Sequence, residues 1–195
     1  MCRSLERFRL GSNIDAEADR ERMKSMSQEY RLSLQEKQEQ AFGFIAGAVR
    51  ERLEKGKPSV IALSSSGTPR RIQSAAAVKL AERLSRQKKC LLVKLELSAE
   101  GKSSGWKEEG SCLTGTNVPA EQLKALLEEK KAQFDAVVLD IPPVMLFSEA
   151  LEYARTADQL YLLERYRYTL YSHYEKTMAL LRDSGLQASG VIACR

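Results

Sequence analysis

The stretch SVIALSSSGTPRRIQSAAAVKLA, residues 59–81, decides the fold that the sequence predicts. It opens with an unbroken apolar run, Val60 to Ser64, as expected for a strand that is buried on both faces. A segment rich in serine, glycine and proline follows, and a helical pattern then runs from Ser74 to Gln87. The apolar face of this helix is formed by Ala77, Leu80, Ala81 and Leu84. The order of strand, loop and helix is that of a phosphate-binding loop.

Apolar runs and helical patterns alternate through the sequence that follows. Further strands are predicted at Leu91–Leu97, Ala136–Ile141, Gln159–Leu163 and Ser189–Cys194. Further helices are predicted at Pro119–Ala132, at Ser148–Arg155 with Ser148 as its cap, and at Tyr168–Ser184 with Gly185 closing it. Apolar strands separated by helices indicate a parallel sheet covered on both faces. We therefore predict an α/β protein with a doubly wound, mostly parallel sheet, as in P-loop NTPases, and an N-terminal helical extension.

The N-terminal part of the chain has its own pattern. Residues 1–13 are predicted to form a loose tail, and a helical pattern runs from Ile14 to Lys55 with a break near residues 35–40. Gly56 and Pro58 are expected to end this region.

Two domains follow from this pattern: a tail and helical extension over residues 1–57, and an α/β domain over residues 58–195. Apolar residues recur at helical spacing in the extension, at Met23, Met26, Tyr30 and Leu34. This stripe either docks on the sheet of the protein or forms a face for a partner or for a second copy.

Composition excludes several classes of protein. The chain has 195 residues, 43% of them hydrophobic and 29% charged, which is typical of a globular domain. Its net charge of +5 is too small to indicate nucleic-acid binding. No apolar run approaches the roughly 18 residues of a membrane span, and the first residues lack the apolar core of a signal peptide. We expect a cytoplasmic protein that reaches a membrane only through a partner.

The cysteines and the histidine do not suggest a metal site. Cys2, Cys90, Cys112 and Cys194 have no metal-binding spacing and are expected to pack as small apolar groups. A site of the Ser-His-Asp type, or a histidine-based metal site, would depend on His173 alone.

Tyrosines crowd the fourth predicted strand and the helix after it, at Tyr161, Tyr166, Tyr168, Tyr171 and Tyr174. Packing and an amphipathic surface account for them, and a cluster of phosphorylation sites is the alternative.

Three loops are expected to meet where ligands bind in such folds, at the carboxyl ends of the strands. They are Ser64–Ser74, Lys94–Ser98 and Asp140–Pro143. The segment from Ser98 to Val118 has no periodicity and is predicted to be a long loop that Trp106 holds down.

The first of these loops lacks most groups that bind phosphate. Ser74 stands where the magnesium-binding hydroxyl belongs, but Gln73 replaces the lysine, and Arg70 and Ile72 replace glycines. A Cβ at both glycine positions disfavours the positive φ that such a loop needs. These replacements argue against ATP turnover.

Asp140 ends an apolar strand beside this loop. It is either an acid that holds magnesium and water or a structural residue that caps the next turn. The tripeptide Gly101-Lys102-Ser103 spells the end of a phosphate loop, but it lacks the glycine five residues earlier and the helix after it, so we do not expect it to bind phosphate.

The order of these elements resembles the cytoplasmic domain of bacterial tyrosine kinases, which regulate the chain length of capsules and exopolysaccharides and are related to MinD/ParA-type P-loop ATPases. The resemblance covers residues 59–195. FDAVVLDIPPV, residues 134–144, is similar to the Walker B stretch of that family, and ADQLYLLER, residues 157–165, to its next strand. SGVIACR, residues 189–195, is similar to its last core strand.

The departures from the family fall on its chemistry. The resemblance puts Gln73 at the catalytic lysine, and Lys94 and Glu96 at the pair of acids of the Walker A′ motif. Of the catalytic set only Ser74 and Asp140 are kept. The family's oligomerisation motif corresponds to Gln28, Arg31 and Leu34, with one member intact.

These features predict a catalytically inactive, tyrosine-kinase-like accessory protein of exopolysaccharide or capsule synthesis or export. Its expected partner is a membrane polysaccharide co-polymerase (a chain-length regulator) or a sister tyrosine kinase, and a homo-oligomer is an open alternative. We expect no cofactor, no metal and no nucleic acid. Arg70, Arg71, Gln73, Ser74 and Asp140 would form a vestigial nucleotide site, with Ser74 and Asp140 as ligands if magnesium bound. The location would be cytoplasmic, at the inner membrane through the partner.

Two alternatives stay open. In one, the chain is a divergent ATP-binding autokinase or ATPase in which Arg70, Arg71 or Lys94 replaces the lysine, because guanidinium groups bind phosphate well. In the other, it is a MinD/ParA-like positioning protein.

Overall fold

The computed structural model describes residues 21, 34–53, 57–97 and 104–194 of the chain. The chain divides into two units, residues 1–41 and residues 42–195, and the second contains the sheet. The predicted Met23, Met26 and Tyr30 stripe lies outside the described residues. So do Gln28 and Arg31 of the oligomerisation motif, the side chain of Leu34, and the Gly101-Lys102-Ser103 tripeptide. The predicted division at residue 57 stays a prediction.

Helix α2, Leu34–Glu51, is the first described element. It is continuous through residues 35–40, so the break predicted there is wrong. That stretch is polar, but glutamine, glutamate and lysine are strong helix formers, and polarity alone does not interrupt a helix. The helix ends before the predicted stop at Gly56, in a turn where the Arg52 N–H donates to the Val49 carbonyl at 3.1 Å.

Seven strands form one sheet in the order β3-β4-β2-β5-β1-β6-β7. Their bounds are β1 Ser59–Ser64, β2 Cys90–Glu96, β3 Gly105–Glu109, β4 Cys112–Thr116, β5 Ala136–Asp140, β6 Gln159–Arg165 and β7 Gly190–Cys194. All neighbours are parallel except β3 and β4, which pair antiparallel. The predicted α/β class and mostly parallel sheet are confirmed.

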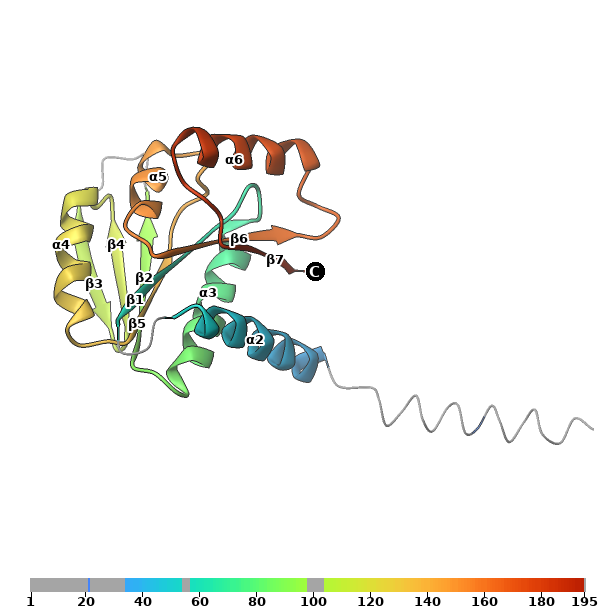
Figure 1. Ribbon diagram of the computed structural model, residues 1–195, viewed down its shortest axis with the longest axis horizontal. Helices are drawn as coiled ribbons and strands as arrows, with labels where there is room; N and C mark the ends of the chain where they lie inside the picture. Colours follow the sequence, from blue (N-terminus) through green and yellow to red (C-terminus); the bar gives the residue numbers. More distant parts are fainter. Residues whose placement is uncertain (1–20, 22–33, 54–56, 98–103, 195) are drawn as a thin grey trace, which may run out of the picture. The chain divides into compact units, whose positions relative to one another are not determined.

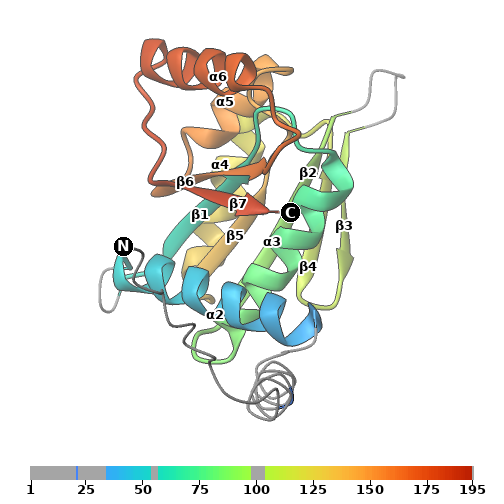
Figure 2. The same ribbon diagram turned by 90° about the vertical axis from the view of Figure 1, so that its right-hand side faces the viewer.

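Helices cover both faces of this sheet (Figure 1). Besides α2 they are α3 Arg70–Ser85, α4 Ala120–Lys131, α5 Ser148–Ala154 and α6 Tyr171–Asp183. One core contains Val49 of α2 and Leu80 of α3, and the other contains side chains of α4, α5 and α6 such as Leu123, Tyr153 and Leu181. Figure 2 shows α3 in front of the sheet, α4 behind it and α6 above β6 and β7. The central strands are therefore buried on both faces, as their apolar runs predicted.

The described part of the predicted loop from Ser98 to Val118 contains an antiparallel hairpin, so that prediction is wrong over residues 105–116. Trp106 lies opposite Gly115 in this hairpin and packs against the core that contains Leu123, which confirms its predicted anchoring role. A Cβ on Gly115 would come within 2.7 Å of the Trp106 ring and 2.8 Å of Val118. Only glycine lets the indole lie this close to β4.

Several helix ends differ from the predictions. Helix α6 begins at Tyr171, three residues after the predicted Tyr168. Ser148 does not cap α5: Phe147 is the N-cap, and the Ser148 hydroxyl donates to Glu149 at 3.1 Å. Helix α3 begins at Arg70, four residues before the predicted Ser74. Gly185 does close α6, with φ of +71° and with hydrogen bonds from its own N–H to the Arg182 carbonyl and from Leu186 to Leu181.

Candidate functional site

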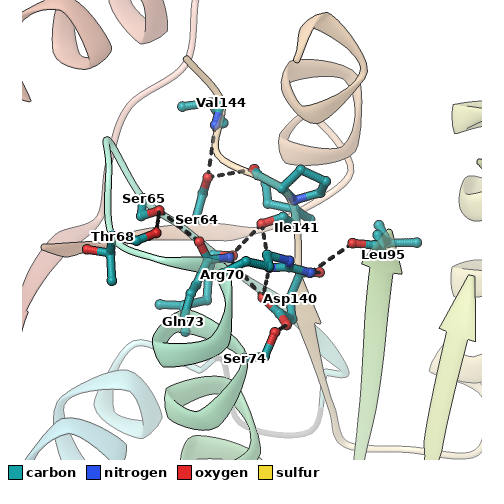
Figure 3. Close-up of polar contacts among 12 residues, drawn as sticks. Ser64, Ser65, Thr68, Arg70, Gln73, Ser74, Leu95, Asp140, Ile141 and Val144 are labelled. Carbon is teal, nitrogen blue, oxygen red and sulfur yellow. Dashed lines mark hydrogen bonds and ion pairs between the residues drawn. The ribbon is translucent and has the colours of Figure 1, made fainter. Parts of the chain in front are cut away.

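The three predicted loops meet at the carboxyl edge of the sheet. Asp140 is the last residue of β5, and it pairs in register with Leu63 of β1 on one side and Lys94 of β2 on the other. The first turn of α3 lies over this point because the connection from β1 to α3 is short. Asp140, Arg70, Gln73 and Ser74 are thereby brought together (Figure 3).

Both carboxylate oxygens of the buried Asp140 accept hydrogen bonds from side chains of α3. Its Oδ1 accepts from Gln73 Nε2 at 2.8 Å and forms an ion pair with Arg70 Nη1. Its Oδ2 accepts from Ser74 Oγ at 2.6 Å. Hydrogen bonds to charged groups contribute about 1.5–3 kcal/mol each. Asp140 is thus a carboxylate with a partner from within the protein on each of its oxygens.

The Arg70 guanidinium is held by backbone carbonyls as well as by Asp140. Nη1 also donates to the Ile141 carbonyl at 3.1 Å, and Nη2 donates to the carbonyls of Leu95 at 2.8 Å and Asp140 at 3.1 Å. Its side chain is 33% exposed. Arg70 therefore ties the ends of β2 and β5 to the start of α3, and its two terminal nitrogens donate into the protein.

Gln73 occupies the position where a phosphate loop has lysine, and it is fully buried. Besides Asp140, its Nε2 donates to the carbonyls of Leu63 at 3.1 Å and Ile141 at 2.6 Å. Its Oε1 accepts from Ser65 Oγ at 2.8 Å. Every polar atom of this amide has a partner in the protein, as a buried amide requires.

The backbone is helical where the sequence pattern places the end of a phosphate loop. The N–H groups of Ile72 and Gln73 donate to the Pro69 carbonyl at 2.9 and 3.2 Å, as in the first turn of a helix. In a phosphate loop, backbone N–H groups of this segment point at the phosphates instead. Arginine, isoleucine and glutamine accept helical geometry where glycines would favour an open loop, which explains the early start of α3.

A second carboxylate engages the segment that leads into α3. Glu164, near the end of β6 and 8% exposed, accepts from the Ser66 N–H at 2.9 Å and the Ser66 hydroxyl at 2.6 Å, both through Oε1. The Thr68 hydroxyl donates to the Leu163 carbonyl at 2.8 Å. Glu164 is a site residue that the sequence did not predict. The available signal was its place at the end of a strand next to β1.

Three other residues named from the sequence lie apart from this network. Arg71 is exposed and makes no polar contact with Asp140. Glu96 is also exposed, at the end of β2. Lys94 is half-buried and lines a cavity beside α3 together with Cys90 and Cys112. Within residues 34–53, 57–97 and 104–194, no group of three or more histidine, cysteine or acidic side chains is placed to hold a metal ion.

A cavity of about 600 Å³ adjoins the network at the carboxyl edge of the sheet. Its walls include Thr68, Arg70, Glu96, Pro142 and Phe147. Ligands of α/β proteins bind in such a position. In this chain the charge of Arg70 is already balanced by Asp140, and the other charged residue of the walls is the exposed Glu96, whose negative charge would repel a phosphate.

Comparisons with known proteins show the fold. No protein-family model matches the chain, and no curated protein matches its sequence. The kinase domain of the Escherichia coli tyrosine kinase ETK is 16% identical, with a TM-score of 0.65 over 80% of this chain and 74% of that one. The VpsO kinase domain is 18% identical, with a TM-score of 0.62 over 83% of this chain and 97% of that one.

A cell-division protein has the same fold. MinD from Aquifex aeolicus, in its complex with MinC, is 14% identical, with a TM-score of 0.56 over 69% of this chain and 68% of that one. The chain therefore shares the fold of bacterial tyrosine kinase domains and of MinD and ParA ATPases, as its sequence predicted. Identities this low concern the fold alone.

Proposed function

We propose that the chain is a catalytically inactive relative of the tyrosine kinase domains whose fold it shares, and that it acts by binding another protein. The observation that carries this proposal is the network around Asp140, in which Arg70, Gln73 and Ser74 take both carboxylate oxygens. The groups that a nucleotide and its magnesium ion require are engaged with one another.

Three features of this site disfavour the binding of ATP and Mg²⁺. The lysine that neutralises the β- and γ-phosphates is a glutamine. The amides of Ile72 and Gln73 are bonded within α3 and do not face a ligand. Magnesium would have to displace the Ser74 hydroxyl and the Arg70 guanidinium from Asp140, and hydrogen bonds to a charged group contribute about 1.5–3 kcal/mol each. Phosphoryl transfer depends on positioning and charge, so the loss of both removes the basis of catalysis.

The contacts of Arg70 count against the alternative in which an arginine replaces the lysine. Nη1 and Nη2 of Arg70 already donate to Asp140 and three carbonyls, and Arg71 is exposed and apart from them. A phosphate would have to compete with all of these acceptors. The third candidate, a MinD/ParA-like positioning protein, requires the same nucleotide site and is disfavoured for the same reason.

The proposed setting is the synthesis or export of an exopolysaccharide or capsule. The partner would be a membrane polysaccharide co-polymerase or a sister tyrosine kinase, and the location the cytoplasmic side of the inner membrane. The sequence resemblance supports this setting. No helix among the described residues is long and apolar enough to cross a membrane.

Incubation of the purified chain with radiolabelled ATP and Mg²⁺ tests the loss of catalysis. An active bacterial tyrosine kinase domain serves as the positive control. We expect no label on tyrosine and no release of phosphate above the rate without protein. Turnover that is abolished by Asp140→Asn would overturn the proposal.

A further inference from the structure

The connection between β6 and α6, Arg165–Tyr171, presents an unusual set of side chains to solvent. Its sequence is RYRYTLY, and we call it the arginine–tyrosine connection. Its large side chains are 51% exposed at Tyr166, 67% at Tyr168, 59% at Leu170 and 73% at Tyr171. They make up half of the exposed large hydrophobic side chains among the described residues. Aromatic residues and arginine are the types most enriched at the centres of protein interfaces.

The backbone of this connection is held in one shape. The Arg165 N–H donates to the Thr169 hydroxyl at 3.0 Å, and the N–H of Thr169 returns to the Arg165 carbonyl at 2.9 Å. The Tyr166 N–H donates to the Cys194 carbonyl at 2.7 Å, which ties the connection to β7. Arg167 has φ of +65°, a conformation that side chains with a Cβ rarely adopt. Such strain persists only where the surroundings enforce it.

Stacking orders the side chains as well. The Arg165 guanidinium lies 3.6 Å from the centroid of the Tyr168 ring, and that of Arg167 lies 5.4 Å from the Tyr166 ring. A guanidinium stacked on a ring keeps its in-plane N–H groups free for a carboxylate, although the Nε of Arg165 is itself buried. The side-chain entropy that binding would otherwise cost is therefore partly lost before a partner arrives.

Positive charge on this surface is only partly balanced nearby. The sequence from Arg165 to Tyr174 contains two arginines and no acid. Of the two flanking acids, Glu164 is buried and accepts from Ser66, whereas Glu175 accepts from Tyr171 of the connection itself, a hydrogen bond that raises the pKa of the tyrosine. The two arginines therefore face one acid on this surface. The connection therefore attracts negative charge.

We propose that the arginine–tyrosine connection docks an acidic segment of a partner protein, with carboxylates of that segment on Arg165 and Arg167 and an apolar or aromatic side chain against Tyr168 and Leu170. The proposal rests on the interaction role proposed above and names the chemistry of the partner. Fixed backbone, stacked rings and a strained arginine favour a partner with a defined shape. An anionic bilayer needs no such ordering, so it is the competing outcome of the test.

Fluorescence anisotropy with a labelled random copolymer of glutamate and tyrosine tests this surface on the full chain. A copolymer of lysine and tyrosine is the control probe. Arg167→Asn removes the charge and keeps a residue that tolerates positive φ, and Tyr168→Ala removes the stacked ring. Lys124→Asn, on the exposed face of α4, removes the same charge elsewhere.

We expect the glutamate–tyrosine copolymer to bind, the lysine–tyrosine copolymer not to bind, and the double variant Arg167→Asn/Tyr168→Ala to weaken binding about tenfold. Lys124→Asn should leave the affinity within about twofold. Equal affinity of the double variant and the wild type would overturn the proposal. So would sedimentation with phosphatidylglycerol vesicles that the double variant abolishes while the copolymer stays unbound. Arg167, Tyr168 and Lys124 lie outside the Asp140 network. The result of this binding experiment therefore does not depend on the result of the kinase assay above.

Discussion

Gln73 Nε2 lies 2.8 Å from Asp140 Oδ1, so the residue at the lysine position of the phosphate loop donates directly to the acid at the end of β5. In a nucleotide enzyme the ligand and its metal stand between these two positions. Here the protein closes that gap with its own side chains, and Arg70 and Ser74 complete the closure. The network has thereby become part of what holds α3 onto the sheet.

Replacing Arg70 should expose how much stability the network supplies. Arg70→Ala leaves the buried Asp140 without its counter-charge and leaves the Leu95 carbonyl without its donor. Because Arg70 is itself one-third exposed, water offsets part of the loss, and we expect about 1–3 kcal/mol lower stability in urea unfolding. Arg71→Ala, one residue on and exposed, should change stability by no more than about 0.5 kcal/mol. Equal effects of the two variants would contradict the structural role of Arg70.

Glu164 should stabilise the fold by accepting hydrogen bonds from Ser66. Glu164→Ala leaves the N–H and the hydroxyl of the buried Ser66 without an acceptor, and each such loss costs about 1–3 kcal/mol. Glu164→Gln keeps a carbonyl oxygen at the same place and should cost less. Unfolding of both variants by urea measures the difference. A glutamine variant as unstable as the alanine variant would contradict this assignment.

Burial raises the pKa of the Cys90 thiol from 9.0 to about 11. The unfolded chain therefore loses this proton first as pH rises, so the contribution of Cys90 to stability is complete below about pH 9 and is lost between pH 9 and 11. At pH 8 the folded protein should carry about a hundredfold less Cys90 thiolate than the unfolded chain. Alkylation by iodoacetamide, followed by peptide mass spectrometry, should be slower at Cys90 by a similar factor. Equal alkylation rates of Cys90 in the folded and unfolded chains would refute the predicted rise of its pKa.

The hairpin of β3 and β4 should depend on the missing side chain of Gly115. Gly115→Ala puts a Cβ 2.7 Å from the Trp106 ring, within the space that the indole fills. Overpacking of this kind costs about 1–3 kcal/mol, which thermal unfolding would detect as a lower midpoint. Gly105→Ala in the neighbouring strand meets open space and is the matched control. The quenching and wavelength of Trp106 fluorescence should also change in the first variant alone.

Much of the fold could be predicted because the central strands are buried on both faces and must be apolar throughout. The runs at Val60, Ala136 and Gln159 each mark a strand of the structure. The hairpin was not predicted because β3 is an edge strand with mostly exposed side chains. Its sequence, GWKEE, shows neither an apolar run nor an alternation of apolar and polar residues. Its signal was the turn at Gly110, which has φ of +60°.

The site could be predicted only in part. Parallel topology brings the ends of β1, β2 and β5 together, so the meeting of Arg70, Gln73 and Asp140 followed from their places in sequence. These side chains form hydrogen bonds with one another only because α3 begins at Arg70. The sequence around Arg70 resembles a phosphate loop, so this early helix start was not predicted. Glu164 was missed because its partner is a backbone N–H together with a serine hydroxyl, which leaves no motif in the sequence.

Titration of the wild-type chain with ATP and Mg²⁺ in an isothermal calorimeter tests the central claim most directly. The network around Asp140 predicts no saturable heat at millimolar nucleotide, with or without magnesium. A stoichiometric isotherm with micromolar affinity that requires Mg²⁺, and that Asp140→Asn removes, would contradict the claim that the protein has filled this site with its own side chains.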